Sequence, residues 1–322
     1  MDSFKTPLKN KLADNVKVQI PPSPLMKKIG FGTSVVVYEL QRSPLPGKFR
    51  SPWAIKKLNR AHKNRDASTF INERLKNEAD ILRKLDHPNV VGFRAFTKDS
   101  DGTNIIAMEE CTSSLGDLIE NRLDYLGDVP YPSDTILKVS YDVAKALDYL
   151  HNTALLLHCD IKSYNILVKG EFEVCKICDF GVCLPLTKSG EMDKNKAGED
   201  AEYIGTPHWS APEVLLCNST ITTKADMYSF GLVIWEMLSL TPPIDDDLLE
   251  STEDEDYSDD LLPISIKKEL TTVRQRPPLP DVDLGPEYNL VLEIYFCCTT
   301  VDSSKRPDAK NLVRLFKEAL QT

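Results

Sequence analysis

The chain has 322 residues, of which 41% are hydrophobic, enough to bury a sizeable core, and it carries a net charge of −10. No apolar run approaches the roughly 20 residues of a membrane-spanning helix, and the first residues lack the apolar core of a signal peptide. The eight cysteines lack the spacing of a secreted disulfide framework, so we expect reduced thiols and a cytoplasmic or nuclear location, or both.

The first 24 residues are unlike the rest of the chain. They contain few aromatic side chains and two proline-directed sites, Thr6-Pro7 and Ser23-Pro24. A segment with so little apolar surface cannot offset the entropy lost on folding. We therefore predict a flexible tail.

Two glycines, Gly30 and Gly32, precede an apolar run that includes Val35 and Val37. Glycine lets a backbone come close to a ligand because no Cβ is in the way. Phosphate-binding loops often have a third glycine where this chain has Val35, and a two-glycine pattern alone is weak. An ordinary turn between strands is the alternative.

The run from Trp53 to Lys56 predicts a strand, and a helix is expected from Glu78 to Leu85. Apolar side chains three, four and seven residues after Glu78 share its helical face. A carboxylate on a buried face is costly unless it is paired, so Lys56 is its candidate partner. The alternative for Lys56 is a solvated surface side chain. We expect the helix to end before Pro88.

Polar residues gather in the run 158–165 (HCDIKSYN) and again in Asp179-Phe180-Gly181. The apolar stretches between them flank Lys169-Gly170-Glu171, which predicts a β-hairpin. Cys175 and Cys178 could indicate zinc or redox chemistry, but a second pair at ligand spacing is missing, so small core residues are favoured.

From Asp179 onward the chain is first polar and then apolar again. Residues 189–200 have almost no apolar side chain, and we expect them to be mobile. The segment then ends in Gly205-Thr206-Pro207 and Ala211-Pro212-Glu213.

These three motifs, at 158–165, 179–181 and 211–213, resemble in this order the catalytic loop, the metal-binding loop and the end of the activation segment of protein kinases. The resemblance extends from about Ile29 to about Phe316. It implies an α+β, bilobal protein kinase fold, with a small β-rich N-lobe containing one main helix and a larger, mostly helical C-lobe. The implied limits are a tail over 1–24, a kinase domain over 25–318 and a C-terminal tail over 319–322. Within the domain we expect an N-lobe over about 25–108, a hinge over about 109–112, a C-lobe over about 113–318 and an acidic insert over 245–260.

The resemblance also implies roles for single residues. Asp160 would accept the hydrogen bond of the substrate hydroxyl, and Lys162 would neutralise charge on the γ-phosphate of ATP. Asn165 and Asp179 would hold Mg²⁺ through oxygen ligands. The residues implied to bind ATP are Ile29, Gly30, Gly32, Val37, Ala54, Lys56, Glu78, Met108, Glu109, Cys111 and Leu167. Those implied to support the catalytic and activation segments are Thr206, Glu213, Asp226 and Arg306, with Thr206 contacting Asp160 and Lys162, and Glu213 pairing with Arg306.

Finer features resemble the PDZ-binding kinase family, also called T-LAK cell-originated protein kinases, which are similar to mitogen-activated protein kinase kinases. They include Phe4-Lys5-Thr6-Pro7, residues 91–97 (VGFRAFT), residues 203–206 (YIGT) and an acidic insert before Arg276-Pro277-Pro278. The family implies phosphorylation of serine and threonine in protein substrates, in mitotic or stress-kinase signalling. The spacing of Asp160 and Lys162 resembles serine/threonine kinases, and tyrosine activity stays open.

One residue departs from the usual pattern. Kinases switched on by activation-segment phosphorylation usually have arginine where this chain has Cys159, because guanidinium pairs with phosphate. We therefore predict regulation through Thr6, whose Thr-Pro-x-Lys setting is the form favoured by cyclin-dependent kinases. Phosphorylation of Thr187 or Ser189 is expected to matter less.

Two function classes remain. An active kinase is favoured because Lys56, Glu78, Asp160, Asn165 and Asp179 are all present. A pseudokinase scaffold is suggested only by Val35 and Cys159.

Residues 245–260 hold ten acidic side chains and no basic one. This stretch is either a solvated insert or a docking site for a basic partner, and it would repel nucleic acid.

Overall fold

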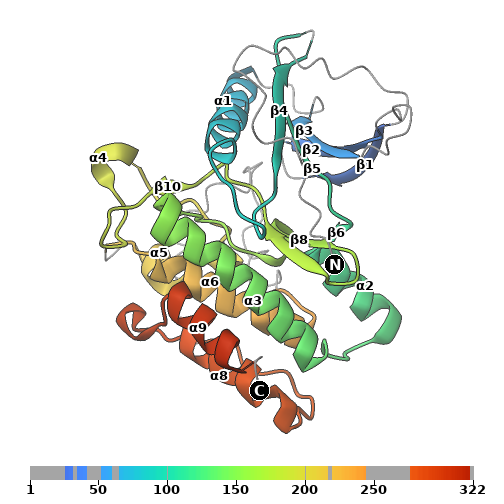
Figure 1. The fold of residues 1–322 in the computed structure, drawn as a ribbon, viewed down its shortest axis with the longest axis vertical. Helices are drawn as coiled ribbons and strands as arrows, with labels where there is room; N and C mark the ends of the chain where they lie inside the picture. The colour runs from blue at the N-terminus through green and yellow to red at the C-terminus, as the bar shows by residue number, and fades with distance from the viewer. Residues whose placement is uncertain are drawn as a thin grey trace, which may run out of the picture. The chain divides into compact units, whose positions relative to one another are not determined.

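The computed structural model describes residues 26–31, 35–41, 52–59, 65–99, 101–199, 201–216, 220–243 and 276–319 (Figure 1). The predicted tail with Thr6, Gly32 and the acidic insert lie outside these residues. The chain divides into two compact units, Met1–Ala79 with Phe93–Glu110, and Asp80–Gly92 with Cys111–Thr322. Among the described helices, none combines the length and hydropathy needed to cross a membrane.

In the part of the first unit that the structure describes there is a five-stranded antiparallel sheet and one helix, α1. The strand order is β1-β2-β3-β5-β4. The elements are β1 (Met26–Phe31), β2 (Val35–Leu40), β3 (Trp53–Leu58), α1 (Arg65–Leu82), β4 (Phe93–Lys98) and β5 (Asn104–Glu109).

The strand register separates the sheet into two faces. Val37 lies opposite Lys56 and Ala54 lies opposite Met108, so these four side chains share one face. The other face carries an apolar cluster, formed by Leu40, Ile55, Ala95, Ile105 and Ala107. One face of the sheet therefore carries the apolar cluster, and the opposite face carries Lys56.

Helix α1 is longer than the sequence analysis predicted. It begins at Arg65, so Glu78 lies near its end rather than opening it. The buried Ile71 and Leu75 lie on the same helical face as Glu78 and Leu82. This spacing was readable in the sequence, but the charged residues between these positions obscured it.

The second unit is mostly helical and contains two small sheets. Its strands are β6 (Ser113–Ser114), β7 (Leu156–Leu157), β8 (Ile166–Lys169), β9 (Val174–Ile177) and β10 (Leu184–Pro185). Its helices are α2 (Leu115–Leu126), α3 (Ser133–Tyr149), α4 (Lys194–Ala197), α5 (Pro212–Leu216), α6 (Lys224–Ser239), α8 (Asn289–Cys298) and α9 (Ala309–Ala319). Helix α6 is buried from Ala225 to Leu238 and packs against α3 and α8.

The predicted hairpin over 166–178 is confirmed, because β8 and β9 pair antiparallel. Gly170 has a φ of 63° in its turn, a conformation that glycine adopts without strain. Cys175 is fully buried in β9, where burial raises the pKa of its thiol to about 12, so it behaves as a core residue.

Residues 80–92 group with the second unit, although the predicted N-lobe included them. Asn89 O accepts a bond of 2.9 Å from Ile177 N, and Val91 N donates to Ile177 O at 2.9 Å. The ring of His87 stacks on Tyr149 of α3 with the centroids 5.0 Å apart. Backbone pairing to β9 thus attaches this stretch to the sheet that leads into Asp179.

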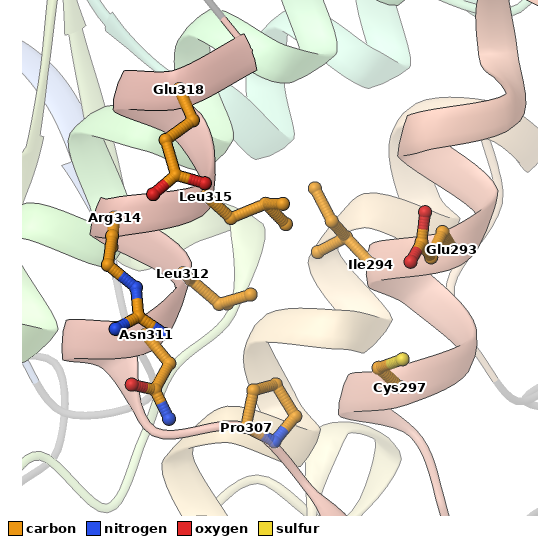
Figure 2. Close-up of a pocket in the computed structure, with 9 residues that line it drawn as sticks. All are labelled: Glu293, Ile294, Cys297, Pro307, Asn311, Leu312, Arg314, Leu315 and Glu318. Carbon is orange, nitrogen blue, oxygen red and sulfur yellow. The ribbon is translucent and has the colours of Figure 1, made fainter.

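A hollow of about 250 Å³ lies between α8 and α9 (Figure 2). Its apolar lining includes Ile294, Leu312 and Leu315, and Cys297 lies at its edge. None of the residues assigned to catalysis lines this hollow.

Candidate active site

The first unit holds a buried ion pair. Lys56 Nζ lies 2.9 Å from Glu78 Oε2, and the two residues are only 6% and 2% exposed. Removing a charge from water costs several kcal/mol unless a partner compensates for it. The pair therefore fixes the ammonium group of Lys56 on the sheet face that also carries Val37, Ala54 and Met108.

The other described residues implied to bind ATP lie on four strands of the first unit, β1, β2, β3 and β5, and at Cys111 and Leu167 of the second unit. Ala54 and Met108 are buried, and Ile29 is 41% exposed. Gly30 pairs with Val37 across β1 and β2. Glu109 Oε2 lies 3.9 Å from Arg94 Nη2. Cys111 and Leu167 belong to the second unit, where Leu167 is half-buried in β8 and Cys111 is buried.

In the second unit, Asp160 is the centre of a hydrogen-bond network. Its Oδ1 accepts bonds from Thr206 Oγ1 at 2.6 Å and from Thr206 N at 3.1 Å. Its Oδ2 lies 3.0 Å from Lys162 Nζ and accepts a bond of 2.8 Å from Asn165 Nδ2. Lys162 Nζ also donates to Thr206 Oγ1 at 2.6 Å. The Asp160 carboxylate is thus held in one orientation by Lys162 and Asn165 of its own loop and by Thr206 of the segment that ends at Glu213.

Asn165 and Asp179 supply the oxygen atoms that suit Mg²⁺. Asn165 Nδ2 donates to both Asp160 O and Asp160 Oδ2, so the side-chain oxygen Oδ1 is the candidate ligand of Asn165 for a cation. Cys178 N donates to Asn165 O at 3.0 Å, so the metal-binding loop starts beside Asn165. Asp179 has a φ of 65° directly after β9. Hard oxygen donors of this kind fit Mg²⁺, which usually takes one or two carboxylates along with substrate phosphates.

Asp226 anchors the catalytic loop from α6. Its carboxylate accepts bonds from His158 N at 2.9 Å and Cys159 N at 3.0 Å, and it lies 2.8 Å from His151 Nε2. Burial favours the protonated form, but the hydrogen bond and charge of His151, with those of His158, hold the pKa of Asp226 below its usual value. A charged, multiply bonded carboxylate therefore fixes the loop.

Cys159 is fully buried and has a left-handed φ of 69°. Its thiol lies in an apolar cluster with Leu157 and Leu186, and burial raises its pKa well above the usual value. Gly205 passes so close that a Cβ there would lie 2.7 Å from the Cys159 carbonyl oxygen. Cys159 therefore offers no positive charge that could bind a phosphate, and a side chain larger than that of glycine would not fit at Gly205.

Glu213 and Arg306 form a bidentate pair, with distances of 2.6 and 2.8 Å. Arg306 is 2% exposed and also donates to the carbonyl oxygens of Lys224, Thr300 and Val301. These bonds tie the end of the activation segment to the start of α6 and to the chain before α9. The pairing joins residues 93 positions apart.

Residues 189–200 were expected to be mobile, and the structure shows backbone contacts in the described part of this stretch, which leave the expected mobility a prediction. Leu186 and Met192 form an antiparallel bridge, and Met192 N donates to Ile221 O at 2.9 Å. The hydroxyl groups of Thr187 and Ser189 lie 2.8 Å apart. Backbone bonds supply here the contacts that apolar side chains do not.

Sequence reasoning assigned no role to three residues that the structure brings together, namely Ser163, Trp209 and Glu236. Glu236 is 3% exposed and bonds to both of the other side chains. The available signal was a single acidic residue inside the apolar run of α6, which is costly to bury without partners.

Comparison with known proteins agrees with this geometry. The protein kinase domain family matches residues 24–315. The human Lymphokine-activated killer T-cell-originated protein kinase is 42% identical to this chain, over 100% of it and 98% of the human protein. The Arabidopsis thaliana Serine/threonine/tyrosine-protein kinase HT1 is 27% identical over 77% of the chain and 55% of its own length. The MAP3K epsilon protein kinase 1 of Arabidopsis thaliana is 32% identical over 76% of the chain and 16% of its own length.

Each unit carries residue types of an ATP-using phosphotransferase, and the family match spans both units. The chain therefore belongs to the protein kinase family, as a serine/threonine protein kinase similar to the human T-cell-originated kinase over its whole length.

Proposed function

We propose that this chain transfers the γ-phosphate of ATP to serine and threonine hydroxyls of proteins, with Mg²⁺ as the metal. The observation that carries the proposal is the network around Asp160, in which Thr206, Lys162 and Asn165 all bond to one carboxylate. Such a preorganised acceptor can take the hydrogen bond of a substrate hydroxyl and aim its oxygen for in-line attack.

The remaining groups manage the negative charge of the nucleotide. Lys56, fixed by Glu78, would hold the α- and β-phosphates, and Lys162 would neutralise the γ-phosphate during transfer. Asn165 and Asp179 would hold Mg²⁺, which when bound screens the phosphate oxygens. Lys56→Met should nearly abolish turnover, because it removes a phosphate contact and breaks the ion pair with Glu78.

The test is transfer of radiolabelled phosphate from ATP to a generic basic protein, with Asp179→Asn measured in parallel. The proposal expects clear labelling by the wild-type chain and near-complete loss in the variant. Equal, background-level labelling by both would favour the pseudokinase scaffold.

We further propose a role in mitotic or stress-kinase signalling in the cytoplasm or nucleus, with Thr6 phosphorylated by a cyclin-dependent kinase. Proline at +1 and lysine at +3 of Thr6 support this, as does the absence of an arginine at Cys159. A phosphate adds about −1.5 to −2 charge, next to Lys5 and Lys9.

Thr6→Ala should lower kinase activity immunoprecipitated from mitotic extracts, and alanine at both Thr187 and Ser189 should have a smaller effect. The regulatory proposal is wrong if Thr6→Ala matches wild type while the double variant is inactive.

A further inference from the structure

The catalytic loop is joined to the activation segment by a second route, separate from Asp160 and Thr206. Ser163 lies directly after Lys162, and its Oγ donates to Glu236 Oε1 at 2.7 Å. Glu236 Oε2 accepts a bond of 2.6 Å from Trp209 Nε1. A single carboxyl group of α6 thus contacts both segments.

This link lies inside the second unit. Ser163 is fully buried, and Glu236 and Trp209 are 3% and 7% exposed. Helix α6 holds Trp209 a second time, because Ser229 Oγ donates to Trp209 O at 2.7 Å. Trp209 lies three residues after Thr206, so its position bears directly on the Thr206 contacts with Asp160 and Lys162.

We infer that Glu236 is a positioning residue for phosphoryl transfer, which fixes Ser163 and Trp209 relative to each other through its two oxygen atoms. The inference rests on the proposed function, because it assigns Glu236 to the geometry of the same reaction. Glu236 acts through Asp160, Lys162 and Asn165 rather than on the substrate itself.

Burial favours a neutral carboxyl group at Glu236. Burial raises the pKa of Glu236 to about 8, although the bonds from Trp209 and Ser163 and the charge of Lys162 lower it. A neutral carboxyl has one O–H and one C=O, and the hydroxyl of Ser163 can accept as well as donate. Glutamine offers N–H and C=O in the same places, so Glu236→Gln keeps both contacts, while Glu236→Ala removes both.

The first experiment compares these two variants in the full chain, with kcat and KM measured separately for ATP and for a peptide substrate. We expect Glu236→Ala to lower kcat on the order of 10-fold to 100-fold, as for small misplacements of a catalytic group. We expect Glu236→Gln to stay within about threefold of wild type. The matched control is Glu120→Gln, because the exposed Glu120 on α2 accepts a bond from Tyr164, the next residue of the loop. It should leave kcat unchanged.

The second experiment is a double-mutant cycle with Ser163→Ala and Trp209→Phe, in the wild-type and the Glu236→Ala backgrounds. If Glu236 joins the two, their effects on kcat are non-additive in wild type and additive without Glu236. A residue that only stabilises the fold would shift thermal unfolding without this coupling in kcat.

The inference is overturned if the effects of Ser163→Ala and Trp209→Phe on kcat are additive in an active chain that retains Glu236. It is also overturned if a folded Glu236→Ala chain has the wild-type kcat. If Glu236→Ala does not fold, the additivity of Ser163→Ala and Trp209→Phe in the chain that retains Glu236 is the deciding result. An inactive wild-type chain would count against the proposed function instead.

Discussion

Helix α6 carries two buried carboxyl groups, Asp226 and Glu236, that contact the same catalytic loop and have pKa values shifted in opposite directions. The pKa of Asp226 lies below its usual value, and burial raises that of Glu236 to about 8. Both are almost fully buried, so burial alone does not explain the difference.

The identity of the partners explains it. The hydrogen bond and charge of His151 and the charge of His158 outweigh burial at Asp226, whereas burial outweighs the partners of Glu236. Asp226 also bonds to His151 and to two backbone N–H groups, whereas Glu236 bonds to Trp209 and Ser163, which are both neutral. Two ends of one helix thus anchor the loop by a charge at one end and by neutral hydrogen bonds at the other.

The largest expected effect on activity comes from Asp160, which lies in the loop that both ends of α6 contact. Asp160→Asn should lower kcat by about 10²-fold or more, because an amide cannot accept the hydroxyl proton. Thermal stability should change little, since the Asp160 side chain is partly exposed. Wild-type kcat in this variant, measured by steady-state phosphorylation of a peptide, would contradict the role of Asp160.

Asp226→Asn should lose both activity and stability. An amide has only one acceptor oxygen, and His158 N and Cys159 N donate to different oxygens of Asp226, so one of these buried N–H groups loses its acceptor. We expect a loss on the order of 3 kcal/mol in the free energy of unfolding, measured by denaturant titration. A loss no larger than that of Glu236→Gln would break the proposed contrast between the two ends of α6.

Glu236→Gln should flatten the pH dependence of stability. A raised folded pKa means that the folded chain binds more protons than the unfolded chain between the usual value of 4.5 and about 8. The contribution of Glu236 is therefore fully present below about pH 4.5 and is lost as the pH rises toward 8. In this pH range the free energy of unfolding of the wild type should fall by up to about 1.4 kcal/mol per pH unit more than that of the glutamine variant.

Denaturant titrations of both chains at pH 5, 6, 7 and 8 provide this comparison. Asp226 has the opposite sign: its lowered pKa gives stability at higher pH that is lost as the pH falls below the usual value of 3.8. Parallel curves for wild type and Glu236→Gln would show that Glu236 is ionised in the folded chain.

The smallest effect is expected from the acidic stretch over 245–260, in contrast to the buried carboxyl groups of α6. Deletion of 245–260 removes ten acidic residues by sequence. Peptide phosphorylation should change little, and binding to a basic protein should weaken at low salt, because charges are screened over about 10 Å at 0.1 M salt. Loss of peptide phosphorylation would show that this stretch supports the second unit.

The sequence was most informative where a local rule applied. The pairing of Lys56 with Glu78 followed from a carboxylate on a buried helical face, and the hairpin over 166–178 followed from two apolar runs around a glycine. The contacts of Thr206 with Asp160 came from family resemblance, since the spacing of these residues carries no such information.

The misses involve contacts between residues distant in sequence. The attachment of 80–92 to the second unit depends on backbone bonds to β9, and backbone bonds leave no mark in the sequence. Glu236 was missed because its partners, Ser163 and Trp209, are 73 and 27 residues away. A buried acid in an apolar run signals that partners exist, but only the fold shows which ones.

The most direct test of this account is a titration of the two carboxyl groups by carbon-13 NMR, in chains labelled at the side-chain carboxyl carbons. Asp226→Asn and Glu236→Gln assign the two resonances. The account predicts a midpoint near pH 8 for Glu236 and an Asp226 signal that stays ionised to below its usual pKa. A Glu236 midpoint near 4.5, or one pKa shared by both groups, would contradict it.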